Sequence, residues 1–265
     1  MARIFLFSIV CFTFFIAEGQ VSIPPFASAE TENRLEYIRY FSQPIQSRSW
    51  EINDDTADAW KRWEVIENFS FGKNRGSIPM IADLQSLHPY FRDKILELIK
   101  ICHAKGIELA IVETYRTHTK QKEYKSMGRK YTRSGAGHSK HQYGLAVDVV
   151  PLIDSTAQWN SIALWRKIGV AGERLGLRWG GRWRHPFDPG HFEWTGGLGT
   201  YHLAQGLFPA VPKSANYPCI DEDLKELRRH WRAWEAEQSV VARKESIRPG
   251  SKFANAKQAG GGGDD

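Results

Sequence analysis

Apolar residues recur with the spacing of a helix in three stretches of the chain. The first covers residues 86–106, where Pro89 lies in the first turn and Gly106 follows the last. Its apolar stripe consists of Phe91, Ile95, Leu98 and Cys102. The second covers 161–177, and the third is a charged stretch at 221–238 with Leu224, Leu227, Trp231 and Trp234 on one side. We predict helices over these three stretches and a turn that leads into a further helix at 114–125. We expect the third stretch to pack on its own domain rather than on a partner.

Alternating apolar and polar residues predict strands at three other places. Residues 107–113 alternate along their length, and residues 144–151 do so up to Pro151, which we expect to end that strand. Residues 191–194 form a short strand after a loop at 178–190. Short strands mixed with helices, without regular βαβ units, indicate an α+β fold.

Composition divides the chain into four parts. Residues 1–19 have a basic start, an apolar run that is short for a membrane span of ~20 residues, and a small-x-small cleavage site, which predicts a signal peptide. Residues 20–80 form an N-terminal extension without a recognisable chemical motif, and 81–205 hold the sharpest patterns. Residues 206–265 form a helical extension that ends in a flexible, glycine-rich tail. An uncleaved anchor is the alternative for the first part, and no other stretch is expected to span a membrane.

The net charge of +6 limits the partners of an exported chain. A basic protein in the periplasm or the extracellular cell envelope suits an anionic cell wall or membrane surface. Nucleic acid is disfavoured, because no nucleic-acid motif occurs and export argues against it. Signal cleavage would leave Cys102 and Cys219, for which a disulfide and free thiols are both open, as is the oligomeric state.

A carboxylate in the middle of a predicted strand is the first sign of chemistry. Because side chains alternate along a strand, one face carries Leu145, Val147 and Val149 and the other carries Gly144, Ala146 and Asp148. Two small residues beside an acid predict an open shelf on the second face. His141 lies just before the strand and could reach Asp148 across this shelf. A surface acid near a loop histidine is the simpler alternative for this pair.

A second group of polar residues strengthens the case for a metal site. His191 and Glu193 share one face of the predicted strand at 191–194, and Asp188 precedes His191 across a Pro-Gly bend. Two histidines and one carboxylate are the usual protein ligands of a catalytic zinc ion, which leaves the fourth position to water. A further carboxylate nearby is the expected general base. The sequence therefore predicts a catalytic zinc site without the HExxH motif.

Three motifs in this order resemble the zinc peptidases that cut peptidoglycan stem peptides. The motifs are Y-R-T-x-x-x-Q from Tyr115 to Gln121, S-x-H-x-x-G-x-A-x-D from Ser139 to Asp148, and D-x-x-H-F-E from Asp188 to Glu193. The family comprises D-Ala-D-Ala carboxypeptidases and dipeptidases and L-alanyl-D-glutamate endopeptidases. The resemblance covers about residues 81–205 and implies a zinc peptidase domain with the hedgehog/DD-peptidase fold, a small antiparallel sheet flanked by helices.

The resemblance also implies roles for single residues. His141, Asp148 and His191 would bind one zinc ion, and Asp188 would be the catalytic base. Arg116 matches the arginine that binds the carbonyl or carboxylate of the substrate, where a guanidinium can stabilise a developing oxyanion.

Three further residues are assigned less specific roles. Ser139 and Gln121 are expected to contact the substrate or to support the site, and loop capping is the alternative for both. Glu193 is expected to support a zinc ligand from outside, and the role of base is its alternative.

These assignments lead to an exported zinc peptidase that acts on peptidoglycan stem peptides. Asp188 stands where the D-Ala-D-Ala enzymes often have glutamate, which favours the L-alanyl-D-glutamate endopeptidases over the D-alanyl-D-alanine carboxypeptidases. A non-hydrolytic, zinc-containing wall-binding module is the alternative of another class, because a fold alone does not guarantee catalysis. A secreted enzyme that lyses other cells would use the same chemistry.

Overall fold

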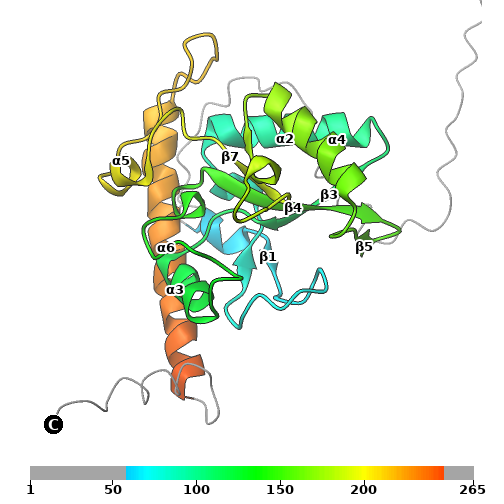
Figure 1. Ribbon diagram of the computed structural model, residues 1–265. Coiled ribbons are helices and arrows are strands. Elements are labelled where there is room, and N and C mark those ends of the chain that lie inside the picture. The colour runs from blue at the N-terminus through cyan, green and yellow to red at the C-terminus, as the bar shows by residue number, and fades with distance from the viewer. Residues whose placement is uncertain (1–57, 248–265) are drawn as a thin grey trace, which may run out of the picture. The chain divides into compact units, whose positions relative to one another are not determined.

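The computed structural model describes residues 58–247, with side chains up to residue 244 (Figure 1). These residues belong to one of the two compact units of the chain, Trp50–Asp265. The predicted signal peptide and the predicted flexible tail lie outside the described residues. Within residues 58–247, no helix has the length and apolar character needed to cross a bilayer.

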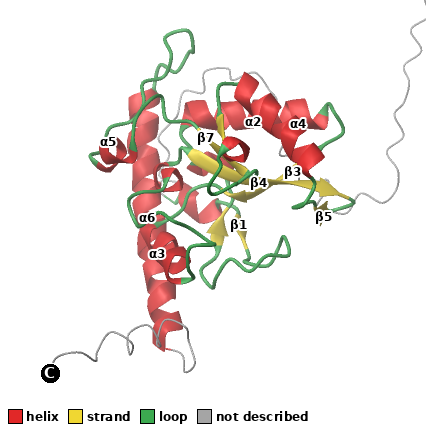
Figure 2. Cartoon of the chain, viewed as in Figure 1, coloured by secondary structure: helices red, strands yellow, loops and turns green. Residues whose placement is uncertain are grey.

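A five-stranded antiparallel sheet forms the centre of the fold, with helices around it (Figure 2). Its main path runs β3 (Glu108–Glu113), β4 (Ala146–Ile153), β7 (His191–Glu193) and β6 (Arg178–Trp179), and β5 (Thr156–Ala157) pairs with the end of β4. A separate pair consists of β1 (Val65–Ile66) and β2 (Met80–Ile81). The predicted strands are present and the α+β class is confirmed, while β6 lies in a stretch that we expected to be a loop.

The prediction that Pro151 ends its strand is wrong. The strand β4 continues through Pro151 to Ile153, and Pro151 lies opposite Leu109 of β3. Proline is tolerated in a strand where its missing N–H removes no bond of the ladder. Here β7 has already ended, since its pairing with β4 stops at Asp148, and the Pro151 carbonyl still accepts a hydrogen bond from the Gln158 backbone at 2.9 Å.

Two of the predicted helices cover one side of the sheet. They are α2 (Pro89–His103) and α4 (Ile162–Arg174), which lie side by side in Figure 1. Pro89 occupies the first turn of α2, as its fixed φ and missing N–H favour. The apolar stripes of both helices are buried with the inner face of the sheet, and this core includes Phe91, Ile95, Leu98, Trp165, Ile168, Val147, Val149 and Phe192.

The third predicted helix, α6 (Ile220–Ile247), packs on its own chain, as expected. A cluster of buried residues joins it to the rest of the fold and consists of Trp63, Ile81, Tyr115, Leu224, Leu227 and Trp231. The ring of Trp231 stacks on that of Tyr115 with centroids 5.0 Å apart, and its Nε1 donates to the Ser86 carbonyl. These contacts anchor α6 beside the motif at 115–121.

The helix α6 also contacts α3 (His118–Ser126), which lies beside it in Figure 1. The Glu235 carboxylate of α6 accepts hydrogen bonds from the backbone N–H groups of His118 (2.6 Å) and Thr119 (3.1 Å). These N–H groups belong to the first turn of α3, where no partner exists within the helix. One further short helix, α5 (Thr200–Ala204), precedes α6, and the 3₁₀ turns are Ala59–Arg62, Leu84–Ser86, Lys140–Tyr143 and Gly180–Arg182.

The face of β4 that carries Asp148 is not the open shelf that we predicted. Ala146 is fully buried, and Gly144, which we predicted on the same face, lies outside β4 with φ +62. A Cβ on Gly144 would lie 2.5 Å from the Trp231 ring, so α6 fills the space above the glycine. Only Asp148 on this face retains partial exposure. Gly144 therefore lets the helix approach, and the opening that remains lies at the Asp148 carboxylate. The two cysteines that sequence left open are both free, Cys102 buried and Cys219 exposed.

Candidate metal centre

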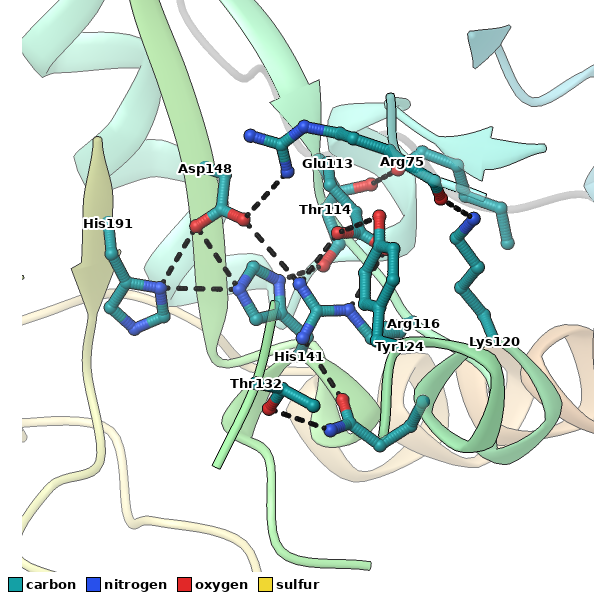
Figure 3. A network of polar contacts seen from close by, with 12 residues as sticks. Arg75, Glu113, Thr114, Arg116, Lys120, Tyr124, Thr132, His141, Asp148 and His191 are labelled. Atoms are coloured by element: carbon teal, nitrogen blue, oxygen red, sulfur yellow. Dashed lines mark hydrogen bonds and ion pairs between the residues drawn. The ribbon is translucent and has the colours of Figure 1, made fainter. Parts of the chain in front are cut away.

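Three side chains from separate elements meet at the partly exposed end of the sheet. His141 comes from the 3₁₀ turn η4 (Lys140–Tyr143), and Asp148 and His191 come from β4 and β7, where they lie directly opposite each other. One ligand atom from each lies within 4.8 Å of the others, and Figure 3 shows the three side chains pointing toward one another. The structure thus brings together the three residues for which the sequence predicts metal binding.

Hydrogen bonds decide which nitrogen of each histidine faces the centre. The Nδ1 of His141 lies 2.7 Å from the Thr114 carbonyl, and because a carbonyl can only accept, Nδ1 carries the proton. The lone pair of its Nε2 then faces His191 Nδ1 (3.3 Å) and Asp148 Oδ1 (3.4 Å). The Nδ1 of His191 lies 3.0 Å from the same Asp148 oxygen. Two imidazole nitrogens and a carboxylate oxygen thus converge, the donor set that zinc prefers.

The electrostatics of the cluster favour a positive charge at its centre. Burial alone would raise the pKa of Asp148, but His141 and His191 hold it well below its usual value. Burial would lower the pKa of His191, but hydrogen bonds to Asp148 and Glu193 raise it to about 10. The ionised carboxylate attracts a cation to the centre, and a zinc ion would take the place of the proton that His191 otherwise holds, so the residues fit a zinc ion.

Glu193 lies behind His191 on the side away from the centre. Its Oε2 is 3.3 Å from His191 Nε2, and its Oε1 accepts from Arg178 at 2.5 Å. Burial would raise the pKa of Glu193, but its contact with His191 lowers it, so the carboxylate is ionised. This arrangement matches the carboxylate that orients a metal-bound histidine in many zinc sites. The geometry favours a role for Glu193 in orienting His191 over the alternative role of base.

Asp188 lies in the loop between η5 (Gly180–Arg182) and β7. Its backbone N–H donates to Gly180, and its carbonyl accepts from His191 N at 3.2 Å. Among residues 58–244, no hydrogen bond holds its carboxylate. Burial and the charge of Asp148 raise the pKa of Asp188. A carboxylate with a raised pKa and free lone pairs is a better proton acceptor than an ordinary aspartate.

Arg116 has most of its hydrogen-bonding capacity in use. Its Nε and Nη2 bind both oxygens of Glu113, at 3.0 and 2.6 Å, and its Nη1 donates to Gln121 at 3.0 Å. The same Nη2 lies 3.5 Å from Asp148 Oδ2 (Figure 3). Glu113 is fully buried, and because its pair with Arg116 outweighs burial, its pKa is lowered. Arg116 thus sits beside the centre, held against the outer oxygen of Asp148.

Gln121 and Ser139 shape the loop that carries His141. The Gln121 amide nitrogen donates to the Ser134 carbonyl (2.7 Å) and to Thr132 (3.1 Å), while its oxygen accepts from Arg116. Ser139 begins η4, and its backbone N–H donates to the Gln142 side chain. These contacts hold the loop, and the hydrogen bond from Arg116 also links Gln121 to the site.

Two residues near the centre were not expected from the sequence. Arg75, from the N-terminal extension, places Nη1 3.7 Å from Asp148 Oδ2. Trp183 places its ring 5.1 Å from that of His191. Neither belongs to a motif, and Arg75 reaches Asp148 only through the tertiary fold, so no local signal in the sequence could have revealed it.

Comparison with known proteins agrees with this geometry. The family described as D-alanyl-D-alanine carboxypeptidase matches residues 132–194, which include all three clustered residues and Asp188. The peptidoglycan L-alanyl-D-glutamate endopeptidase CwlK of Bacillus subtilis (strain 168) is 30% identical over 130 residues, 44% of this chain and 76% of that protein. The L-alanyl-D-glutamate peptidase of Listeria phage A118 is 26% identical over 150 residues, 56% of this chain and 51% of that protein. The chain thus spans about half the length of the phage relative.

Solved structures of similar proteins include the Serratia marcescens L-Ala D-Glu endopeptidase ChiX, at 26% identity and a TM-score of 0.37 over 42% of this chain and 83% of that one. A His–Asp–His centre beside an aspartate of raised pKa is a donor set suited to a metallopeptidase. The chain belongs to the D-alanyl-D-alanine carboxypeptidase family, peptidase family M15, as the resemblance implied.

Proposed function

We propose that the chain is an exported zinc metallopeptidase that hydrolyses peptidoglycan stem peptides at the L-Ala–D-Glu bond. The observation that carries the proposal is the convergence of His141, Asp148 and His191 beside Asp188. Two relatives named for this bond, CwlK and the phage peptidase, support the choice. Cleavage of D-Ala–D-Ala is the second candidate, and the description of the matched family favours it.

One zinc ion would be held by His141 Nε2, His191 Nδ1 and Asp148 Oδ1. When bound, zinc polarises a carbonyl and lowers the pKa of water toward ~7. The chain's own contribution begins with orientation, since the Thr114 carbonyl and the Glu193 carboxylate fix the two imidazoles. Both histidines are buried, so bulk water has little access to compete for their ring nitrogens.

Asp188 acts as the base in this proposal. Its carboxylate accepts a proton from the attacking water and passes it to the amine that leaves when the peptide bond breaks. The raised pKa of Asp188 favours the first of these steps, because a carboxylate of ordinary pKa is a weaker base and accepts the proton of water less readily.

Arg116 supports the centre through charge and position. Its guanidinium faces the Asp148 oxygen that points away from the histidines, and the buried Glu113 fixes the guanidinium plane. The positive charge also lowers the energy of negative charge that develops on the substrate carbonyl. Gln121 and Ser139 hold the loop that carries His141.

The N-terminal pattern and the substrate class support export to the periplasm or the outer cell envelope. The basic charge of +6 suits an anionic wall, and no role for nucleic acid is proposed.

Mass spectrometry of zinc-loaded protein incubated with muropeptides of defined stem length tests the proposal. Release of a peptide that begins at D-Glu, stopped by a chelator, is the expected result. Loss of a terminal D-Ala alone would instead assign the carboxypeptidase activity. If zinc is bound but neither bond is cut, the chain is the non-hydrolytic wall-binding module.

A further inference from the structure

The loop between β1 and β2 brings two cations to the edge of the metal centre. Arg75 extends its guanidinium toward Asp148, with Nη1 3.7 Å from Oδ2 (Figure 3). Lys73 places Nζ 3.7 Å from the centroid of the Trp159 ring, and Arg75 Cζ lies 5.6 Å from the same ring. The Arg75 side chain is 19% exposed, so it is ordered by its neighbours yet still open to a ligand.

A buried ion pair between Lys120 and Glu123 holds this loop in place. Lys120 Nζ donates to the carbonyls of Arg75 and Ile78, both at 2.5 Å, and pairs with Glu123 at 2.7 Å. Glu123 in turn accepts from the Ser77 backbone at 2.5 Å. The Lys120 and Glu123 side chains are almost fully buried, and burying such charges is unfavourable unless their partners are fixed. The pair therefore fixes the backbone on which Arg75 stands.

Gly76 and Trp159 complete the support of the loop. Gly76 has φ +96, and a Cβ there would lie 2.5 Å from the Glu123 carboxyl carbon, so only glycine lets the loop approach the ion pair. At the other end, Trp159 Nε1 donates to the Phe71 carbonyl at 2.8 Å. Contacts on both sides of Arg75 along the chain therefore fix the backbone of the loop.

The two arginines beside Asp148 differ in what they can still bind. Arg116 uses its guanidinium on Glu113, Gln121 and Asp148. Arg75 has a side-chain hydrogen bond with Tyr124 and an ion pair with Asp148 at 3.7 Å, but it retains partial exposure and has Lys73 as a neighbouring cation. Asp148 and Asp188 already offset part of these two positive charges, and an anion of the substrate that approaches the edge of the centre is attracted by both cations.

We propose that Arg75, with Lys73 beside it, binds the carboxylate of the substrate residue that supplies the leaving amine. The inference rests on the proposed function. In both candidate linkages, L-Ala–D-Glu and D-Ala–D-Ala, that residue bears a carboxylate close to the bond that is cut. Asp188 would protonate the same amine, and Asp188 is close enough to Lys73 to act on its charge. The cations and the base thus lie where one residue of the substrate can meet both.

Two matched peptides test the inference: a stem peptide with D-glutamate, and the same peptide with that free carboxylate replaced by a carboxamide. The expected wild-type preference for the acid is about tenfold to a hundredfold in kcat/KM, mainly through KM. Arg75→Gln removes most of this preference by slowing the acid while changing the amide less than about threefold. Lys73→Gln also reduces the preference for the acid peptide, but by a smaller factor. Arg174→Gln, which removes an exposed charge from α4, leaves the preference unchanged.

The zinc content of every variant is measured beside the kinetics. If Arg75→Gln slows both peptides equally, or loses zinc, Arg75 serves only to hold Asp148 and the inference is overturned. If wild-type protein cuts neither peptide, the proposed function fails, and calorimetric titration of both uncut peptides decides the inference by itself. Tighter binding of the acid that disappears in Arg75→Gln and Lys73→Gln supports it, and equal binding of acid and amide overturns it.

Discussion

His88 is a buried histidine with no hydrogen-bond partner for either ring nitrogen within the described part of the chain. Its ring packs between Trp194, at 5.2 Å, and Phe208, at 6.1 Å, and its exposure is 0%. Burial, aided by the nearby Arg92, lowers the pKa of His88 from 6.5 to about 4. The folded protein therefore keeps this ring neutral at pH values where the unfolded chain takes up a proton.

The sign and the size of the effect follow from this difference in pKa. Above pH 6.5 the ring is neutral in both states, and stability does not depend on it. As the pH falls from 6.5 to about 4, only the unfolded state binds the proton, so the free energy of unfolding decreases. One pKa unit corresponds to ~1.36 kcal/mol, so the full loss is about 3 kcal/mol. For a domain of marginal stability this is a large share of the total.

Urea unfolding followed by tryptophan fluorescence, at several pH values between 8 and 4, measures the effect. His88→Leu replaces the titrating group with an apolar side chain of similar size. Over this pH range, the free energy of unfolding of the wild type is expected to decrease by about 3 kcal/mol more than that of the variant. All other titrating groups, the metal centre included, are common to both proteins and cancel in the comparison. His103→Leu, at the exposed last residue of α2, which follows His88, is the control. Parallel pH profiles for wild type and His88→Leu would refute the reasoning.

The metal centre and α6 carry three more predictions. Asp188→Asn lowers kcat by about 10²-fold or more with unchanged zinc content, and retained activity together with its loss in Glu193→Ala would move the base to Glu193. Glu193→Gln weakens zinc binding about tenfold to a hundredfold in a competition titration with a chromophoric chelator, and unchanged affinity contradicts its orienting role. Trp231→Ala lowers the free energy of unfolding by about 3–5 kcal/mol in urea, and a loss below about 1 kcal/mol shows that its contacts with Tyr115 and Ser86 do not stabilise the fold.

Much of the fold could be predicted because its elements carry local periodicity. The stripe from Phe91 to Cys102 defines α2, and alternation along 107–113 defines β3. Alternation also places Asp148 and His191 each on a face of its own strand, although their direct pairing depends on how β4 and β7 meet in the sheet. Pro151 misled the prediction, because whether a proline breaks a strand depends on where the neighbouring strand ends, which is not a local property.

The surroundings of the site were harder to predict for the same reason. Arg75 contacts Asp148 from a segment with no motif, and its place depends on the buried pair of Lys120 and Glu123. Glu113 reads as the end of a strand, although its carboxylate holds Arg116. Periodicity places a residue on a face of its own element, but contacts between distant segments depend on how the elements pack.

The cap that α6 places on α3 has a consequence for how this enzyme can be divided. Gln121 in α3 holds both Arg116 and the histidine loop, and Glu235 of α6 satisfies the first N–H groups of α3. A fragment cut after residue 205 would retain every proposed zinc ligand but lose the cap and the cover over Tyr115. Chimeras that exchange catalytic cores between relatives therefore need to transfer α6 together with the core.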